Sequence, residues 1–114
     1  MMRSLVVFAV LLGGVMLIAA RPAEAGFIKR DFLIKSCASS DEQRLADCTG
    51  YLIGVTDTTQ SEAGSKVCVP AGLAIRNLRD AVVYYLRAHA KGEPDGDAAP
   101  AVRAALRALY PCPQ

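Results

Sequence analysis

The sequence has one histidine, and its four cysteines form no Cys-x-x-Cys pair. The usual zinc motifs combine such cysteine pairs with further cysteines or histidines, so we expect no metal site. Nucleophilic catalysis needs a serine or a thiolate beside a base, and His89 is the only imidazole in the chain. We expect His89 to be a solvated residue near a helix end. The sequence therefore predicts a protein that is not an enzyme and that binds no cofactor.

The sequence also lacks a cluster of positive charge. Its 13 basic and 11 acidic residues are interspersed, and they give a formal net charge of +2. Proteins that bind nucleic acids carry a concentrated basic surface, so we expect no nucleic acid partner. The alternating pattern of a β-strand is missing as well, as are repeats and low-complexity segments. These absences indicate an all-α domain.

One long apolar run is present, from Leu5 to Ala20, and it follows the positive charge of Arg3. Ala23-Glu24-Ala25 then has the small–x–small pattern of a signal peptidase site. We expect residues 1–25 to be a signal peptide and residues 26–114 to form a mature periplasmic domain without stable membrane insertion. An uncleaved anchor is the alternative, although the run is shorter than the ~20 residues that span a bilayer.

All four cysteines lie in the predicted mature domain, at Cys37, Cys48, Cys68 and Cys112. An even number of cysteines in a short exported chain indicates disulfides. A domain of this size buries a small core and usually needs such covalent support. We therefore expect the mature protein to have no free thiol.

Periodic apolar positions predict a small antiparallel domain of four or five helices. The second helix is the best defined, because Ser39 and Ser40 begin two overlapping capping boxes and the apolar residues after them recur at helical spacing. Glycines and prolines separate the later helices. The expected helices are residues 26–36, about 41–58 or further, about 73–90, and the segment that Asp97 caps and Pro111 ends.

This arrangement favours one of the three ways to pair four cysteines. In an antiparallel third and fourth helix, the start of one lies beside the end of the other, which brings Cys68 to Cys112. Cys37 precedes the second helix and lies near its second turn, where Cys48 faces inward. The other pairings would place partners at opposite ends of a helix some 20–30 Å long, whereas bridged Cα atoms lie within about 7 Å.

Two glycines, Gly50 and Gly54, lie four residues apart and therefore on one side of the second helix. Each costs about 1 kcal/mol relative to alanine inside a helix. We therefore expect another backbone or a large side chain to pack closely against this side, within the domain or across a dimer. A membrane dimerisation face, the other use of this spacing, does not fit a helix that carries Arg44, Asp47 and Asp57.

Several motifs in the mature chain form a recognisable set. They are Cys48-Thr49-Gly50-Tyr51-Leu52-x-Gly54-Val55-x-Asp57, Cys68-Val69-Pro70 and the terminal Tyr110-Pro111-Cys112. Together they resemble the Tai family, the immunity proteins against amidases of type VI secretion systems, over nearly the whole mature chain. The resemblance implies a periplasmic helical protein with disulfides, often a homodimer. Such a protein binds and blocks a peptidoglycan amidase that a neighbouring bacterium injects or that the cell itself makes.

The resemblance also implies steric inhibition, with a protruding segment of the immunity protein in the cleft of the enzyme. We expect the polar loop before the last helix to be this segment, because Pro94 limits its freedom. A cysteine amidase cleft, with its catalytic histidine, should attract the carboxylates of such a loop. The partner-binding residues that we expect are Lys91, Glu93, Pro94, Asp95 and Asp97.

Two other functions fit the same composition. A periplasmic acid-stress chaperone is also small, helical and disulfide-bonded, and it exposes apolar surface at low pH. Two disulfides would resist that opening, which counts against this alternative. The second alternative is a non-catalytic envelope-associated module without a toxin partner.

Overall fold

The computed structural model describes residues 26–114, so the predicted signal peptide and its cleavage site lie outside the described residues. The described chain forms four helices: α1 (Arg30–Cys37), α2 (Glu42–Ser61), α3 (Ile75–Ala90) and α4 (Ala98–Leu109). The all-α prediction with four helices is confirmed, and residues 26–114 contain neither a fifth helix nor a strand. None of these helices is both long and apolar enough to cross a bilayer.

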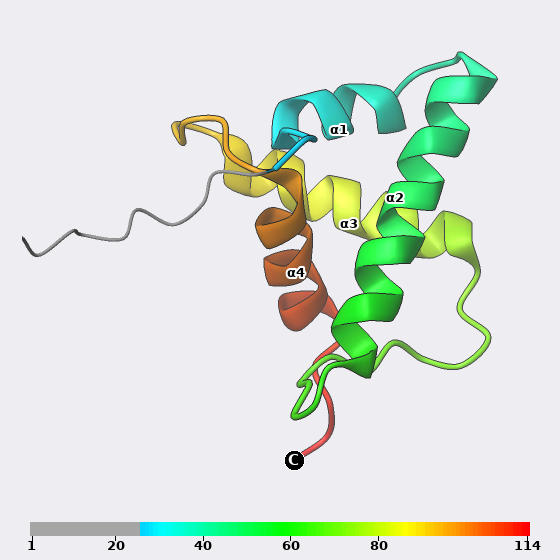
Figure 1. Ribbon diagram of the computed structural model, residues 1–114, viewed down its shortest axis with the longest axis vertical. Helices are drawn as coiled ribbons and strands as arrows, with labels where there is room; N and C mark the ends of the chain where they lie inside the picture. Colours follow the sequence, from blue (N-terminus) through cyan, green and yellow to red (C-terminus); the bar gives the residue numbers. More distant parts are fainter. Residues whose placement is uncertain (1–25) are drawn as a thin grey trace, which may run out of the picture.

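The helices are arranged less regularly than a row of antiparallel neighbours. In Figure 1, α2 and α4 run in the same direction, and α1 and α3 cross them. Each helix contacts the other three, so one core lies at the centre. Its buried apolar side chains are Leu33, Cys48, Leu52, Val67, Leu78, Val82, Val83, Leu86, Ala98, Val102, Ala105 and Leu106.

Two of the predicted helix starts differ from the structure. The first helix begins at Arg30 rather than at residue 26, because Lys29 forms an antiparallel bridge with Asp97 and leaves helical geometry. The second helix is not capped by Ser39 or Ser40 as predicted. Asp41 is its N-cap, and its Oδ1 accepts a hydrogen bond from the Arg44 N–H at 2.9 Å.

The predicted disulfides are confirmed. Cys37 and Cys48 are bonded with Cα atoms 5.2 Å apart, and Cys68 and Cys112 with Cα atoms 4.8 Å apart. No cysteine of the described chain is free. Both distances lie in the usual range for disulfides.

The second disulfide reinforces a pair of short extended segments rather than the start of α3. Because α2 and α4 run the same way, their ends come together. The chain after α2 then pairs with the chain after α4: the Cys68 N–H donates to Tyr110 O at 2.8 Å, and the Cys112 N–H donates to Lys66 O at 3.0 Å. Residues 66–68 and 110–112 are thus joined by backbone hydrogen bonds as well as by sulfur.

The two disulfides should differ in their contribution to stability. They close loops with sequence separations of 11 and 44 residues, which in the loop-closure model correspond to about 3 and about 4 kcal/mol. Replacing Cys68 and Cys112 with serine should therefore lower the free energy of unfolding more than replacing Cys37 and Cys48. Urea unfolding of both double variants measures this, and a larger loss in the Cys37/Cys48 variant would contradict the entropic account.

Thr56 on α2 is a buried polar residue that should lower the stability of the fold. Its side chain is 4% exposed, and its Oγ1 has no hydrogen-bond partner in the described chain. Thr56→Val should therefore raise the free energy of unfolding by about 1 kcal/mol, because an unpaired buried hydroxyl is removed at nearly constant shape.

Thr59→Val is the matched control for this substitution. Thr59 is also buried, but its Oγ1 donates to Val55 O. This substitution should cost about 0.5–1.5 kcal/mol, the usual contribution of one hydrogen bond. Thermal unfolding of both variants measures these changes. An equal change in the two would contradict the view that the Thr56 hydroxyl is buried without a partner.

Candidate partner-binding surface

The loop between α3 and α4 has an exposed tip. Lys91, Glu93 and Pro94 are all exposed, and Gly92 has a φ of +76°, which allows the chain to turn directly after α3. The Glu93 N–H donates to Ala90 O at 3.2 Å and closes this turn. The tip is therefore a compact turn at the end of a helix.

The second half of the same loop is attached to the start of α1. The Arg30 N–H donates to Gly96 O at 2.8 Å, and the Asp31 N–H donates to Asp95 Oδ1 at 3.1 Å. Lys29, the N-cap residue of α1, makes no capping bond with its own side chain. The loop thus satisfies N–H groups of α1 that would otherwise lack a partner.

An ion pair strengthens this attachment. Lys29 Nζ lies 2.6 Å from Asp97 Oδ1, and the Ala98 N–H donates to Ile28 O at 2.9 Å. Arg30 is buried and lies with Nη2 3.0 Å from Asp31 Oδ1 and 3.5 Å from Glu93 O. We refer to these contacts between residues 28–31 and 93–98 as the clasp.

The residues that were expected to bind the partner together fall into two groups in the structure. Asp95 and Asp97 are engaged with the start of α1, whereas the carboxylate of Glu93 makes no ion pair with another described residue. Sequence analysis missed Lys29, Arg30 and Asp31 as the partners of the loop. Opposite charges in the two segments were a signal for this contact, but interspersed charges offer many such pairings.

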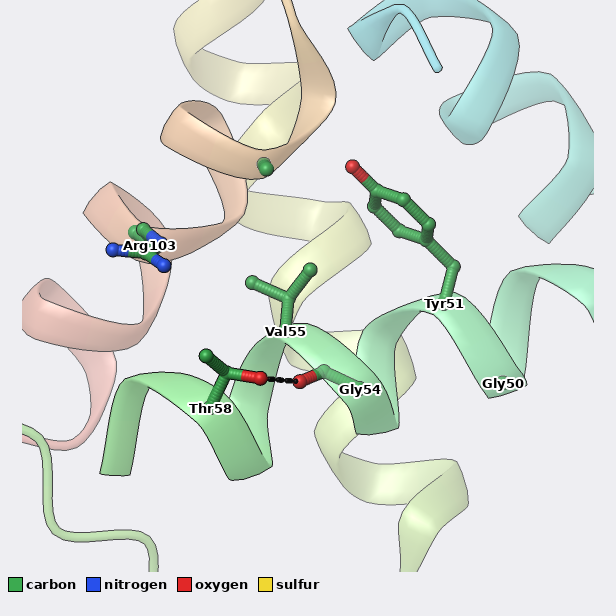
Figure 2. A pocket seen from close by; sticks show the side chains of 7 residues that line it. Gly50, Tyr51, Gly54, Val55, Thr58 and Arg103 are labelled. Carbon is green, nitrogen blue, oxygen red and sulfur yellow. Dashed lines mark hydrogen bonds between the residues drawn. The ribbon is translucent and has the colours of Figure 1, made fainter. Parts of the chain in front are cut away.

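A second candidate surface is the open groove between α2 and α4. Its volume is about 370 Å³. Figure 2 shows Tyr51 and Val55 rising from α2 toward α4, with Arg103 on α4 and a hydrogen bond from Thr58 Oγ1 to Gly54 O. The residues that line the groove are Gly50, Tyr51, Gly54, Val55, Thr58, Ala99 and Arg103.

The two glycines of this groove do not pack against another part of residues 26–114. A Cβ atom built on Gly50 or Gly54 meets nothing within 4 Å. The expectation of close packing inside the domain is therefore wrong, and packing across a dimer stays a prediction. A glycine pattern shows only where space is available, and the sequence did not show whether a neighbour fills it.

Tyr51 connects the groove with the clasp. Its pKa is raised above the ordinary value, first because burial disfavours the charged phenolate and second because the Asp97 carboxylate is close. The carboxylate at the start of α4 therefore acts on the phenol group in the middle of α2.

His89 has an ordinary place in the structure. Its ring stacks on Tyr85 with centroids 3.8 Å apart, and Nδ1 lies 2.8 Å from Tyr85 O. The side chain is exposed near the end of α3. Residues 26–114 contain no group of three or more His, Cys, Asp and Glu side chains that could hold a metal ion.

A structured loop tip and an open groove are thus two exposed features of a domain with two disulfides, and they suit a protein-binding module. Residues 29–112 match the model of the Rap1a immunity proteins, and the chain belongs to this family. The match includes all four helices and both disulfides. A search of curated proteins finds no match.

The family membership confirms the immunity class that the motifs indicated, while the narrower resemblance to the Tai family stays a prediction. Immunity proteins act on an effector by binding it, so the family implies an effector partner and a non-catalytic inhibitory role.

The open space above the glycines gives a direct prediction. Gly50→Ala and Gly54→Ala should each raise the free energy of unfolding by up to about 1 kcal/mol, because alanine is the better helix former and its methyl group meets nothing. Gly72→Ala is the control: it also has open space, but its φ of +80° makes alanine strained. Urea unfolding of the three variants, at protein concentrations at which the chain is monomeric, measures these changes, and a loss at Gly50 or Gly54 would show that the space is not open within the domain.

Proposed function

We propose that the protein is a periplasmic immunity protein that binds and sterically blocks a peptidoglycan amidase effector of a type VI secretion system. The observation that carries the proposal is the family match over residues 29–112. The periplasmic location is supported by the leader pattern and by two disulfides, since disulfides persist in oxidising compartments. The amidase is supported by the resemblance of the cysteine and glycine motifs.

The tip at residues 91–94 is the segment that we propose for the enzyme cleft. It is exposed, and its flanks are fixed by α3 on one side and by the clasp on the other. Such a loop loses little conformational entropy when it docks, which favours affinity. In this proposal Glu93 and Pro94 contact the enzyme with Lys91 beside them, while Asp95 and Asp97 hold the loop in place.

Glu93→Gln tests the tip without disturbing the clasp. The substitution should weaken inhibition of a cognate amidase by about tenfold, which corresponds to about 1.4 kcal/mol, and leave the melting temperature unchanged. The effect should shrink at high salt, because exposed charges are screened. The inhibition is measured as peptidoglycan digestion with and without the protein. The enzymes are candidate amidases from type VI effector gene clusters.

Glu42→Gln is the matched control, since Glu42 is also an exposed carboxylate but lies in the first turn of α2. It should leave inhibition unchanged. Full inhibition by a variant with Gly-Ser in place of residues 91–94 would exclude the tip and favour the α2–α4 groove as the binding surface. If no amidase is inhibited by the parent protein, the amidase proposal itself fails.

We propose the same groove as the contact surface of a homodimer. Gly50 and Gly54 would let a helix of the second copy approach α2 closely, as small residues do at helix contacts. A two-fold interface repeats each substitution on both sides. The alanine variants of these glycines should therefore sediment as a weaker dimer than the parent protein, and unchanged sedimentation would exclude the groove as the interface.

A further inference from the structure

Gly26 lies directly against the carboxylate of Asp97. A Cβ atom built on Gly26 would lie 2.2 Å from Asp97 Cγ, 2.4 Å from Oδ1 and 2.6 Å from Oδ2. Such distances are far below van der Waals contact. The other glycines of the described chain have nothing within 4 Å of the same position. A side chain at residue 26 is therefore incompatible with this placement of Asp97.

The same geometry places the backbone nitrogen of Gly26 near a negative charge. The nitrogen of any residue lies about 2.5 Å from its own Cβ position, so the Gly26 nitrogen is within about 5 Å of the Asp97 carboxylate. In the uncleaved chain this nitrogen belongs to a neutral peptide group. After cleavage between Ala25 and Gly26 it becomes an α-ammonium group, charged below about pH 8.

We propose that removal of the leader completes the clasp: the new α-ammonium group of Gly26 pairs with the carboxylate of Asp97. The proposal rests on the cleavage between Ala25 and Gly26 that the sequence predicts. No covalent step beyond that cleavage is involved. The pairing is an N-terminal amine captured by a carboxylate that is already in position.

Charges around the clasp favour an additional cation. Lys29 and Arg30 contribute positive charge, whereas Asp31, Asp95 and Asp97 contribute negative charge. The α-ammonium group of Gly26 would balance these two sets. The pKa of Tyr51 on α2 is raised first by burial and second by the same carboxylate. A second cation near Asp97 would reduce this electrostatic effect.

The side chain of Asp97 is available for this role. Asp97 is the N-cap residue of α4, but its carboxylate makes no capping hydrogen bond to that helix. It points instead to Lys29 and Gly26, and it is 25% exposed. The ammonium group would therefore join residues 26–29 to the start of α4. It would thereby help to fix the loop that carries the proposed binding tip.

A double-substitution cycle tests the pairing. Residues 26–114 contain all four helices and both disulfides, and a fusion protein cut before Gly26 supplies this chain. It is compared with the same chain carrying an Nα-acetyl group, each with Asp97 or with Asp97→Asn. Acetylation should lower the melting temperature by about 2–5 °C at pH 6.5 when Asp97 is present. It should have little effect in the Asp97→Asn chain.

The pH dependence follows from the sign of the interaction. A paired ammonium has a higher pKa when folded than when unfolded. Its stabilisation is therefore fully present below the unfolded value of about 7.7–8.0 and is lost as the pH rises through the folded value. The difference between the free and the acetylated chain should vanish at high pH. The neighbouring charged or titratable groups are the same in both chains, so the comparison isolates the α-amino group; they are Lys29, Arg30, Asp31, Asp95 and Tyr51.

A steric control separates charge from space. Gly26→Ala should destabilise both the parent and the Asp97→Asn chain, because asparagine has the shape of aspartate. It should be tolerated with Asp97→Ala, which removes the colliding atoms. Equal effects of acetylation with Asp97 and with Asp97→Asn would overturn the pairing.

Intact mass of the exported protein tests the cleavage independently. A mass that begins at Gly26 supports the proposal, and a mass that retains Ala25 overturns it. Neither result affects the tests of amidase inhibition, so failure of this inference and failure of the proposed function are distinguishable.

Discussion

The contact between the start of α1 and the start of α4 is the interaction on which the rest of the fold depends. α1 is only eight residues long and has no side-chain cap of its own, so its first N–H groups need partners from elsewhere. Gly96 O and Asp95 Oδ1 supply them. A short helix is marginal in isolation, and the clasp therefore determines where α1 begins and which face of it reaches the core.

A second contact of the same kind lies near the end of α4. Residues 66–68 and 110–112 pair through backbone hydrogen bonds, and the Cys68–Cys112 disulfide joins them covalently. α4 is thus held at its start by ions and hydrogen bonds and at its end by sulfur. The ion pair at the start of α4 is weakened by salt, because exposed charges are screened, whereas the covalent contact at its end is broken only by reduction.

Much of this fold could be predicted from the sequence, because local patterns determine it. Helical spacing and the glycine and proline breaks located the four helices, and chain geometry selected the disulfides. The start of α1 could not be predicted, since Lys29 and Asp97 are 68 residues apart in sequence and only the folded chain brings them together. Whether the space beside Gly54 is open also could not be predicted, because it depends on the position of α4 relative to α2 in the folded chain.

The candidate site was predicted only in part, for a related physical reason. Composition identified residues 91–97 as a polar loop, but a carboxylate has the same sequence signal whether it binds a partner protein or its own chain. The carboxylates of Asp95 and Asp97 pair with groups of the start of α1, whereas the carboxylate of Glu93 at the tip pairs with no described residue. Under the proposed function, substitutions at the tip should therefore change recognition at little cost in stability, whereas substitutions in the clasp should change both. If residues 91–94 contact the effector as proposed, they can vary while the contacts of Asp95 and Asp97 keep the loop in position.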